Sequence, residues 1–338
     1  MRRAFSAFTG LESSSHKENE PQPAGANLAQ KKERMAPMNT LAPSNTVTTR
    51  DPKGLKFVSI VEAAFNKAKL SEEEAQRVND TPGLSELVDN FIAENRVGNQ
   101  FADEEVRSNY RYPEEYKGSR PIEEQIKTLA KIFGLSPDDA LAYAKTIASK
   151  PLNGGEGRFA IVSDAGLAKL FPNVTDPAEL FCLGSNLVLE KIEATKRPFH
   201  NYRKGELTKD CFRRHIKTTA AYEKIVSEQK GDIWIIDGQL AMKHRGRSVR
   251  RACVCFTGSE FGLDPIAGGS IALTHPERFV RSSELDMDLA GAEFTPGADG
   301  GFSGAPDFFF YGGELVFDAD YVACPLGGFG SASGFTSQ

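Results

Sequence analysis

Apolar residues recur at three- and four-residue steps in several segments between residues 55 and 150. That spacing is typical of amphipathic helices, which bury one face and expose the other. Helix starts are also marked, because Ser71 opens a capping box with Glu74, and Pro82 and Pro137 each follow a residue able to cap a first turn. The pattern predicts a helical region over 55–150, with these positions on its apolar faces: Phe57, Ile60, Val61, Ala64, Phe65 and Ala68; Leu84, Leu87, Val88, Phe91 and Ile92; Ile122, Ile126, Leu129, Ala130 and Phe133.

The pattern changes at the Gly-rich segment 151–157, where we place a domain boundary. A short strand is predicted at 158–162, and helices are predicted from Asp176 and from Thr208. The apolar run 233–236 is typical of a strand buried on both faces. Further strands are predicted at 270–274, 284–289, 307–311 and 314–318, with a tight glycine turn between the last two. Helices followed by strands indicate an α+β fold with a mainly antiparallel sheet over 151–338.

Residues 1–54 hold only isolated apolar residues among Ser, Pro, Asn and charged positions, so we expect a disordered arm there. The segment 99–120 carries three tyrosines among many charges and is predicted to be an irregular connection. The 338-residue chain is 40% hydrophobic and 26% charged, which is typical of a soluble globular protein. Since no apolar run approaches the ~18 residues of a membrane span, we expect no membrane partner.

The net charge of −5 hides an uneven charge distribution. Residues 282–338 contain nine acidic residues and neither Lys nor Arg, whereas 243–251 pack five positive charges into nine residues without one acid. Four of those five are arginines, whose planar forks bind carboxylates or phosphates through two hydrogen bonds. We therefore predict an anion-binding stretch made of Lys243, His244, Arg245, Arg247, Arg250 and Arg251.

Three occupants of this stretch are possible. The favoured one is the acidic C-terminal tract of the same chain, 282–338, which would dock its carboxylates there. A phosphate-bearing ligand or a nucleic acid is the second, although the sequence pI of about 5.7 is lower than nucleic-acid binders usually have. The third is plain solvent. His244, set among these charges, is expected to have its charged form disfavoured.

Candidate catalytic residues lie elsewhere. Asp286 and Asp288 would share one face of a strand, where two carboxylates could hold Mg²⁺ or Ca²⁺, with Glu293 and Asp307 adding oxygens. The alternative interpretation is the polar, solvent-facing side of a half-buried strand. His275, at a predicted strand end, is a candidate base. We favour the non-catalytic interpretations and expect neither a cofactor nor a resident metal ion.

The five cysteines, an odd number scattered along the chain, do not form a disulfide pattern and favour a reducing cytoplasm. If their segment is a strand, Cys253 and Cys255 would lie on one face of it and could make half of a zinc or redox site. No second cysteine pair or nearby histidine pair completes four ligands, so buried structural thiols are the favoured interpretation.

Several short sequences in the last third of the chain resemble an uncharacterised protein family of candidate-phylum bacteria: KHRGRSVRRA at 243–252, EFGL at 260–263, THPERF at 274–279 and GSASGF at 330–335. The resemblance implies a bacterial cytoplasm and carries no activity. From the residues we therefore predict a non-enzymatic binding or interaction protein. The alternative is a hydrolase or transferase acting on a phosphorylated or acyl substrate through Asp286, Asp288 or His275.

Overall fold

The computed structural model describes residues 49–85, 87–88, 92, 98–148, 150–152, 154–295 and 301–337. The predicted disordered arm lies outside the described residues as far as residue 48. Its last residues belong instead to a helix, because Pro52 occupies the first helical position of α2 (Pro52–Ala68). Among the described residues, no helix combines the length and apolar character that crossing a bilayer requires.

The helix α2 is followed by α3 (Glu72–Asn79), and the predicted capping box is present between them. The Ser71 side chain accepts from the Glu74 backbone, and the Glu74 carboxylate accepts from the Ser71 backbone N–H. Lys69 ends α2 in the left-handed conformation. Neither helix has a buried residue.

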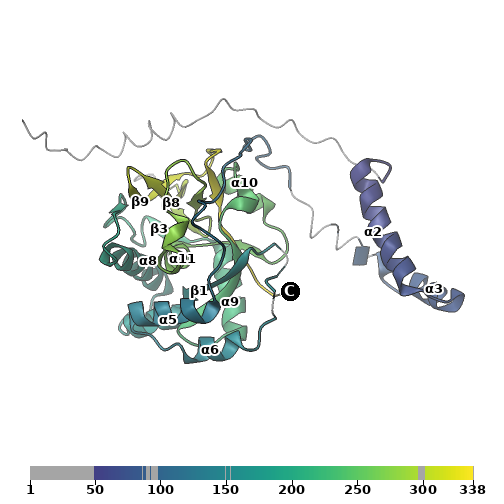
Figure 1. The fold of residues 1–338 in the computed structure, drawn as a ribbon, viewed down its shortest axis with the longest axis horizontal. Coiled ribbons are helices and arrows are strands. Elements are labelled where there is room, and N and C mark those ends of the chain that lie inside the picture. Colours follow the sequence, from purple (N-terminus) through teal and green to yellow (C-terminus); the bar gives the residue numbers. More distant parts are fainter. Residues whose placement is uncertain are drawn as a thin grey trace, which may run out of the picture. The chain divides into compact units, whose positions relative to one another are not determined.

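A four-stranded antiparallel sheet organises the first part of the folded region, in the order β1, β4, β11, β5. The strand β4 (Ile233–Gln239) pairs with β1 (Gly157–Val162) along its length and is buried on both faces, as predicted for its apolar run. β11 (Ser333–Phe335) lies between β4 and β5 (Glu260–Gly262). The helices α5 (Ile122–Phe133) and α11 (Pro265–Thr274) pack against β1 (Figure 1).

The second sheet is mostly antiparallel and contains the long hairpin of β8 (Gly304–Tyr311) and β9 (Glu314–Tyr321) (Figure 1). Its glycine turn is as predicted, because Gly312 and Gly313 both have positive φ, at 63° and 91°. The order is β10, β6, β8, β7, β3, with β9 on β8 and β2 on β9. The other bounds are β2 (Phe199–Asn201), β3 (Phe212–Arg214), β6 (Asp286–Asp288), β7 (Ala292–Phe294) and β10 (Phe329–Ser331).

Two predicted elements are wrong, and the strand considered for the cysteine pair is absent. Residues 270–274 lie in the helix α11, every residue of which is buried, and not in a strand. The helix predicted from Thr208 begins later, because 212–214 form β3 and α9 (Ile216–Glu228) starts after His215. Cys253 and Cys255 lie in the helix α10 (Val249–Cys255). The remaining helices are α6 (Asp138–Ala144), α7 (Asp164–Leu170) and α8 (Pro177–Ala194), with short 3₁₀ turns η1 (Met242–His244) and η2 (Pro276–Arg278).

One hydrophobic core joins the two sheets. It contains Leu129 of α5, Phe159 of β1, Trp234 of β4 and Phe308 of β8, all at most 1% exposed. The helices α5 and α6 precede the boundary predicted at residue 151, but α5 contributes to the same core as the strands that follow it. The structure thus belongs to the α+β class, with a core that continues across that boundary.

Candidate site at the arginine-rich stretch

The basic stretch 243–251 folds into two short turns joined at a glycine. Lys243 and His244 end the 3₁₀ turn η1, and Ser248 caps α10 by accepting from the Arg251 backbone N–H. Gly246 between them has a φ of 75°, and a Cβ there would lie 2.3 Å from the Val106 carbonyl oxygen. Only glycine therefore allows the upstream chain to approach this closely.

That upstream chain is residues 98–112, which we call the strap. Its Glu104 carboxylate receives hydrogen bonds from Arg250 Nε at 2.8 and 2.9 Å to its two oxygens, and a further one from Arg250 Nη2. The Ser248 hydroxyl donates to the same carboxylate at 2.6 Å. Burial opposes ionisation of Glu104, but these donors hold its pKa below its usual value.

The neighbouring Glu105 is bound by two further arginines. Arg251 Nε donates to it at 2.5 Å, and Arg247 Nε lies 3.5 Å from its second oxygen. The remaining arginine of the stretch, Arg245, donates to the Tyr110 carbonyl at 2.8 Å. All four predicted arginines thus contact the strap.

Backbone contacts align the strap with the stretch. Glu105 and Arg247 form an antiparallel β-bridge, and the Val106 N–H donates to the Gly246 carbonyl at 2.7 Å. The Ser248 N–H donates to the Glu104 carbonyl at 3.1 Å. Side chains and backbone of the stretch together hold the strap at Glu104 and Glu105, directly after the turn at 100–103.

These partners differ from the one that the charge distribution favoured. The carboxylates described at the arginines belong to Glu104 and Glu105, and not to the 282–338 tract. That tract meets the stretch through its backbone, since the Gly246 N–H donates to the Phe329 carbonyl at 2.8 Å and Arg245 bridges to Gly330. The sequence alone does not single out Glu104 and Glu105, because they are two of many charged residues in a segment without periodicity.

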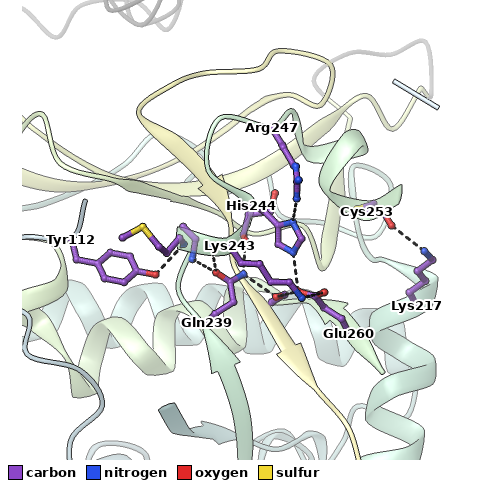
Figure 2. Close-up of polar contacts among 12 residues, drawn as sticks. Tyr112, Lys217, Gln239, Lys243, His244, Arg247, Cys253 and Glu260 are labelled. Carbon is purple, nitrogen blue, oxygen red and sulfur yellow. Dashed lines mark hydrogen bonds and ion pairs between the residues drawn. The ribbon is translucent and has the colours of Figure 1, made fainter. Parts of the chain in front are cut away.

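Lys243 and His244 face inward, onto a buried carboxylate that the sequence analysis missed. Glu260 is fully buried at its side chain, and it accepts from Lys243 Nζ at 2.6 Å and lies 2.8 Å from His244 Nε2 (Figure 2). The Ser333 hydroxyl donates to it at 2.5 Å. Because Arg247 donates to His244 Nδ1 at 2.9 Å, the ring proton lies on Nε2 and points at Glu260.

The electrostatics of this network follow from burial and hydrogen bonding. Burial lowers the pKa of His244, as expected for its disfavoured charged form, although the neighbouring arginine and lysine are the smaller causes. Burial alone would raise the pKa of Glu260, but hydrogen bonds from His244, Lys243 and Ser333 hold it at about 2. At neutral pH the network therefore contains an ionised carboxylate.

Gln239 and Tyr112 fix the turn that carries Lys243 and His244. The Gln239 side-chain oxygen accepts from the backbone N–H groups of Ala241 and Lys243, at 2.9 and 3.1 Å (Figure 2). The Tyr112 hydroxyl accepts from the Met242 N–H at 3.0 Å. Ala241 has a φ of 105°, which is strained for a residue with a Cβ, and these bonds hold it there.

His275 does not occupy a position from which it could act as a free base. Its side chain is buried, Nε2 accepts from the Arg120 N–H at 3.0 Å, and Nδ1 lies 2.9 Å from the Thr274 hydroxyl. Burial lowers its pKa to about 4. The described contacts of His275 do not include Asp286 or Asp288, so the structure does not assemble these three candidates into one group.

Asp286 and Asp288 are buried, at 5% and 8% exposure, so the interpretation of a polar, solvent-facing side of a half-buried strand is wrong. Register places Asp288 opposite Asp307 of β8 on one side and Ser331 of β10 on the other. Asp307 therefore lies beside Asp288 as expected, whereas Glu293 pairs with Arg213 at 2.7 Å. Within the described ranges, no three His, Cys, Asp or Glu side chains are arranged to hold a metal ion.

The cysteines are free thiols. Burial raises the pKa of Cys253 to about 12 and also raises that of Cys255, so neither is a reactive thiolate at neutral pH. Cys255 is buried, as the favoured interpretation expects, whereas Cys253 is half-buried.

A cavity of about 160 Å³ lies beside β4 and is lined mainly by apolar groups, with the Arg158–Asp237 ion pair in its wall. None of the predicted site residues lines it. Comparison with family models, with curated proteins and with solved structures finds no match to this chain.

Proposed function

We propose that this chain is a non-enzymatic interaction protein whose arginines bind an acidic segment of polypeptide. The strap occupies this surface in the chain itself, and an acidic or phosphate-bearing segment of a partner would compete for the same arginines. Arg245, Arg247, Arg250 and Arg251 are the recognising residues, while Lys243 and His244 support them from the inner side through Glu260.

The single observation that carries the proposal is the combined recognition of Glu104 and Glu105 by side chains and backbone. Arginine forks bind the two carboxylates, and the β-bridge at Arg247 fixes the register of the segment. Recognition of acidic or phosphorylated motifs by arginine clusters and pairing with an exposed backbone are both recurring modes of peptide binding. A phosphate group offers the same forks a stronger set of acceptors than a carboxylate does.

Exchange of the strap for a partner requires the partner to supply anionic oxygens in place of those it displaces. The Glu104 side chain is 12% exposed, and Arg251 and Glu105 are 10% and 17% exposed, so these arginines would be costly to leave without a carboxylate or phosphate. In the strap, regular pairing is limited to the bridge at Glu105. A competing segment would therefore have to replace the two carboxylates and this short backbone pairing.

The test measures binding of two fluorescent peptides that copy residues 100–110, one unmodified and one with phosphoserine replacing Glu104. Wild-type protein is compared with the double variant Glu104→Gln/Glu105→Gln, in which the arginines lose their internal carboxylates. Removing the internal competitor should tighten binding of both peptides by about 10-fold, because it raises the fraction of competent protein. Binding should weaken as salt is raised.

The matched control is Glu115→Gln, which removes a carboxylate that pairs with Arg281 outside the stretch. It should leave the peptide affinities unchanged. If the double variant binds no better than this control, or if neither peptide binds at low salt, the arginines serve the fold alone and the proposal fails.

The enzyme alternative rests on one observation. The row of Ser331, Asp288 and Asp307 across three neighbouring strands gathers a hydroxyl and two carboxylates, but all three are buried and none lines a described pocket, so a substrate would have to open the sheet to reach them. Hydrolysis of p-nitrophenyl phosphate or p-nitrophenyl acetate that is lost in Asp288→Asn would favour it. Equal background rates for both proteins would remove it.

A further inference from the structure

The cavity of about 160 Å³ beside β4 contains no residue of the arginine stretch or the strap. Its walls include the buried side chains of Ile225 on α9, Ile235 on β4 and Phe335 on β11. Ala148 and Leu152 also line it and are exposed, so the cavity is open to solvent on their side. A small molecule can therefore enter it without rearrangement of the core.

The volume of the cavity sets the size of its occupant. A cavity of about 150 Å³ lined by leucine, isoleucine and phenylalanine takes up one benzene molecule, whereas sites for drug-sized ligands begin at about 300 Å³. The occupant is therefore a single ring with one short substituent. Apolar walls of this kind favour the ring over water, because they offer water no hydrogen bonds.

The polar part of the lining contains a guanidinium group that still has an unused donor. Arg158 Nε donates to Asp237 at 3.1 Å, and Nη2 donates to the Lys150 carbonyl at 2.6 Å. No described residue accepts from the third nitrogen, Nη1, and this atom is accessible, not sealed in the core. Both oxygens of Asp237 are bound, because the second accepts from the Leu152 N–H at 3.1 Å. The ion pair thus has a donor left over and no acceptor.

The Tyr143 hydroxyl is a second unused donor in the lining. Burial raises the pKa of Tyr143, and the charges of Glu228, Asp237 and Arg158 also act on it, which shows that the hydroxyl lies near the ion pair. No described residue forms a hydrogen bond with this hydroxyl. Two donors from different elements, α6 and β1, are therefore available to one acceptor oxygen of an occupant.

The charges around the cavity favour an uncharged occupant. Lys150 and Arg158 balance Asp237 and Glu228, and all four line the cavity. Because the fork of Arg158 is already engaged, a carboxylate would receive only Nη1 and would lie against the Asp237 carboxylate. An ammonium group would lie beside the arginine and would find no free acceptor at the ion pair.

We propose that this cavity binds a small, uncharged ring compound with a carbonyl oxygen. The oxygen accepts from Arg158 Nη1 and from the Tyr143 hydroxyl, and the ring lies among Ile225, Ile235 and Phe335. This inference goes beyond the proposed function, since the cavity shares no residue with the surface that would bind an acidic segment.

The test follows the isoleucine methyl groups of the full chain by NMR during titration with acetophenone, a neutral aryl ketone of the required size. The methyl groups of Ile225 and Ile235 should shift in a saturable way, with a Kd on the order of 1 mM. Ile216, which is 78% exposed on α9 and outside the cavity, is the internal control and should not shift.

Benzoate has nearly the same size and shape as acetophenone but is anionic at pH 7. It should bind at least about 10-fold more weakly, because its carboxylate would face that of Asp237. If acetophenone causes no saturable shift at Ile225 and Ile235, or if benzoate binds as tightly, the proposal is overturned.

Two variants test the position of the ligand and its hydrogen bond. Ala148→Trp places a large ring at the open side of the cavity from an exposed position and should weaken acetophenone binding by at least about 10-fold. Its matched control is Ala142→Trp, because Ala142 is exposed on α6 and outside the lining; that variant should bind like the wild type. Tyr143→Phe keeps the ring and removes the hydroxyl, so it should weaken binding by about 3- to 10-fold. Wild-type affinity in Ala148→Trp or in Tyr143→Phe would contradict the proposal.

Discussion

His275 illustrates how a residue that suggests catalysis in the sequence can serve the fold. Both ring nitrogens have partners, and the ring makes edge contacts with Tyr116 and Phe159. The sequence could identify a histidine at the end of an apolar segment. It could not show that the backbone of Arg120, 155 positions away, would supply the hydrogen bond that fixes the neutral ring.

This burial predicts a specific loss of stability in acid. Because the folded pKa of His275 is about 4 and the ordinary value is 6.5, the unfolded chain binds the proton more readily. The stability that the neutral, buried ring contributes is therefore fully present above pH 6.5 and is lost as the pH falls toward 4. The loss in the free energy of unfolding is at most about 3 kcal/mol. Replacing His275 by Gln should reduce the pH dependence of urea unfolding across that window, and His215 and His244, whose pKa values burial also lowers, account for the part that remains. The same replacement at the exposed His200 should leave the dependence unchanged, and a flat profile in the wild type would contradict the argument.

At the scale of elements, short apolar runs were the least predictable from sequence. The apolar run 270–274 predicts a strand, yet it ends α11, whose start is capped by Asp264 with Pro265 in the first turn. A buried strand and a fully buried helix have the same composition, so periodicity cannot separate them. By contrast, the β8–β9 hairpin was predictable because its turn demands two residues with positive φ.

The close contact between the strap and the arginine stretch at Gly246 can be tested by substitution. Gly246→Ala would combine a strained φ with a Cβ only 2.3 Å from the Val106 carbonyl oxygen, so the strap must move. We expect a loss of about 2 kcal/mol or more in unfolding free energy and faster tryptic cleavage at Arg107. Gly312→Ala is the control, because Gly312 also has positive φ but nothing lies within 4 Å of its Cβ position. It should cost only about 1 kcal/mol and leave cleavage at Arg107 unchanged. Equal effects at the two glycines would mean that the strap is not held tightly there.

At the scale of the whole molecule, the sequence predicts that the arginines bind carboxylates. It favours those of the 282–338 tract, whereas the arginines bind Glu104 and Glu105. Every acid of a chain attracts an arginine in the same way, and only the fold decides which of them comes close. The fold brings the strap to the arginine stretch although the two segments are far apart in the sequence. Glu104 and Arg250, for example, are 146 positions apart. Net charge by segment favoured the 282–338 tract, whose Asp286 and Asp288 the sheet instead buries.

A second property of the whole molecule is the continuity of its core across residue 151, which predicts one cooperative unfolding transition. Leu129 of α5 and Phe308 of β8 are both fully buried and belong to the same cluster as Trp234, the only tryptophan. Truncating either side chain to Ala leaves a cavity and should cost about 3–4 kcal/mol. Because the core is shared, both variants should shift the unfolding midpoint reported by Trp234 fluorescence, and far-UV circular dichroism should give the same midpoint. Leu152→Ala, at a side chain 39% exposed, should shift it little. Phe308→Ala could instead leave the fluorescence midpoint in place and lower the midpoint of a separate transition seen by circular dichroism. That result would mean that the two sheets unfold as independent units and do not share one core.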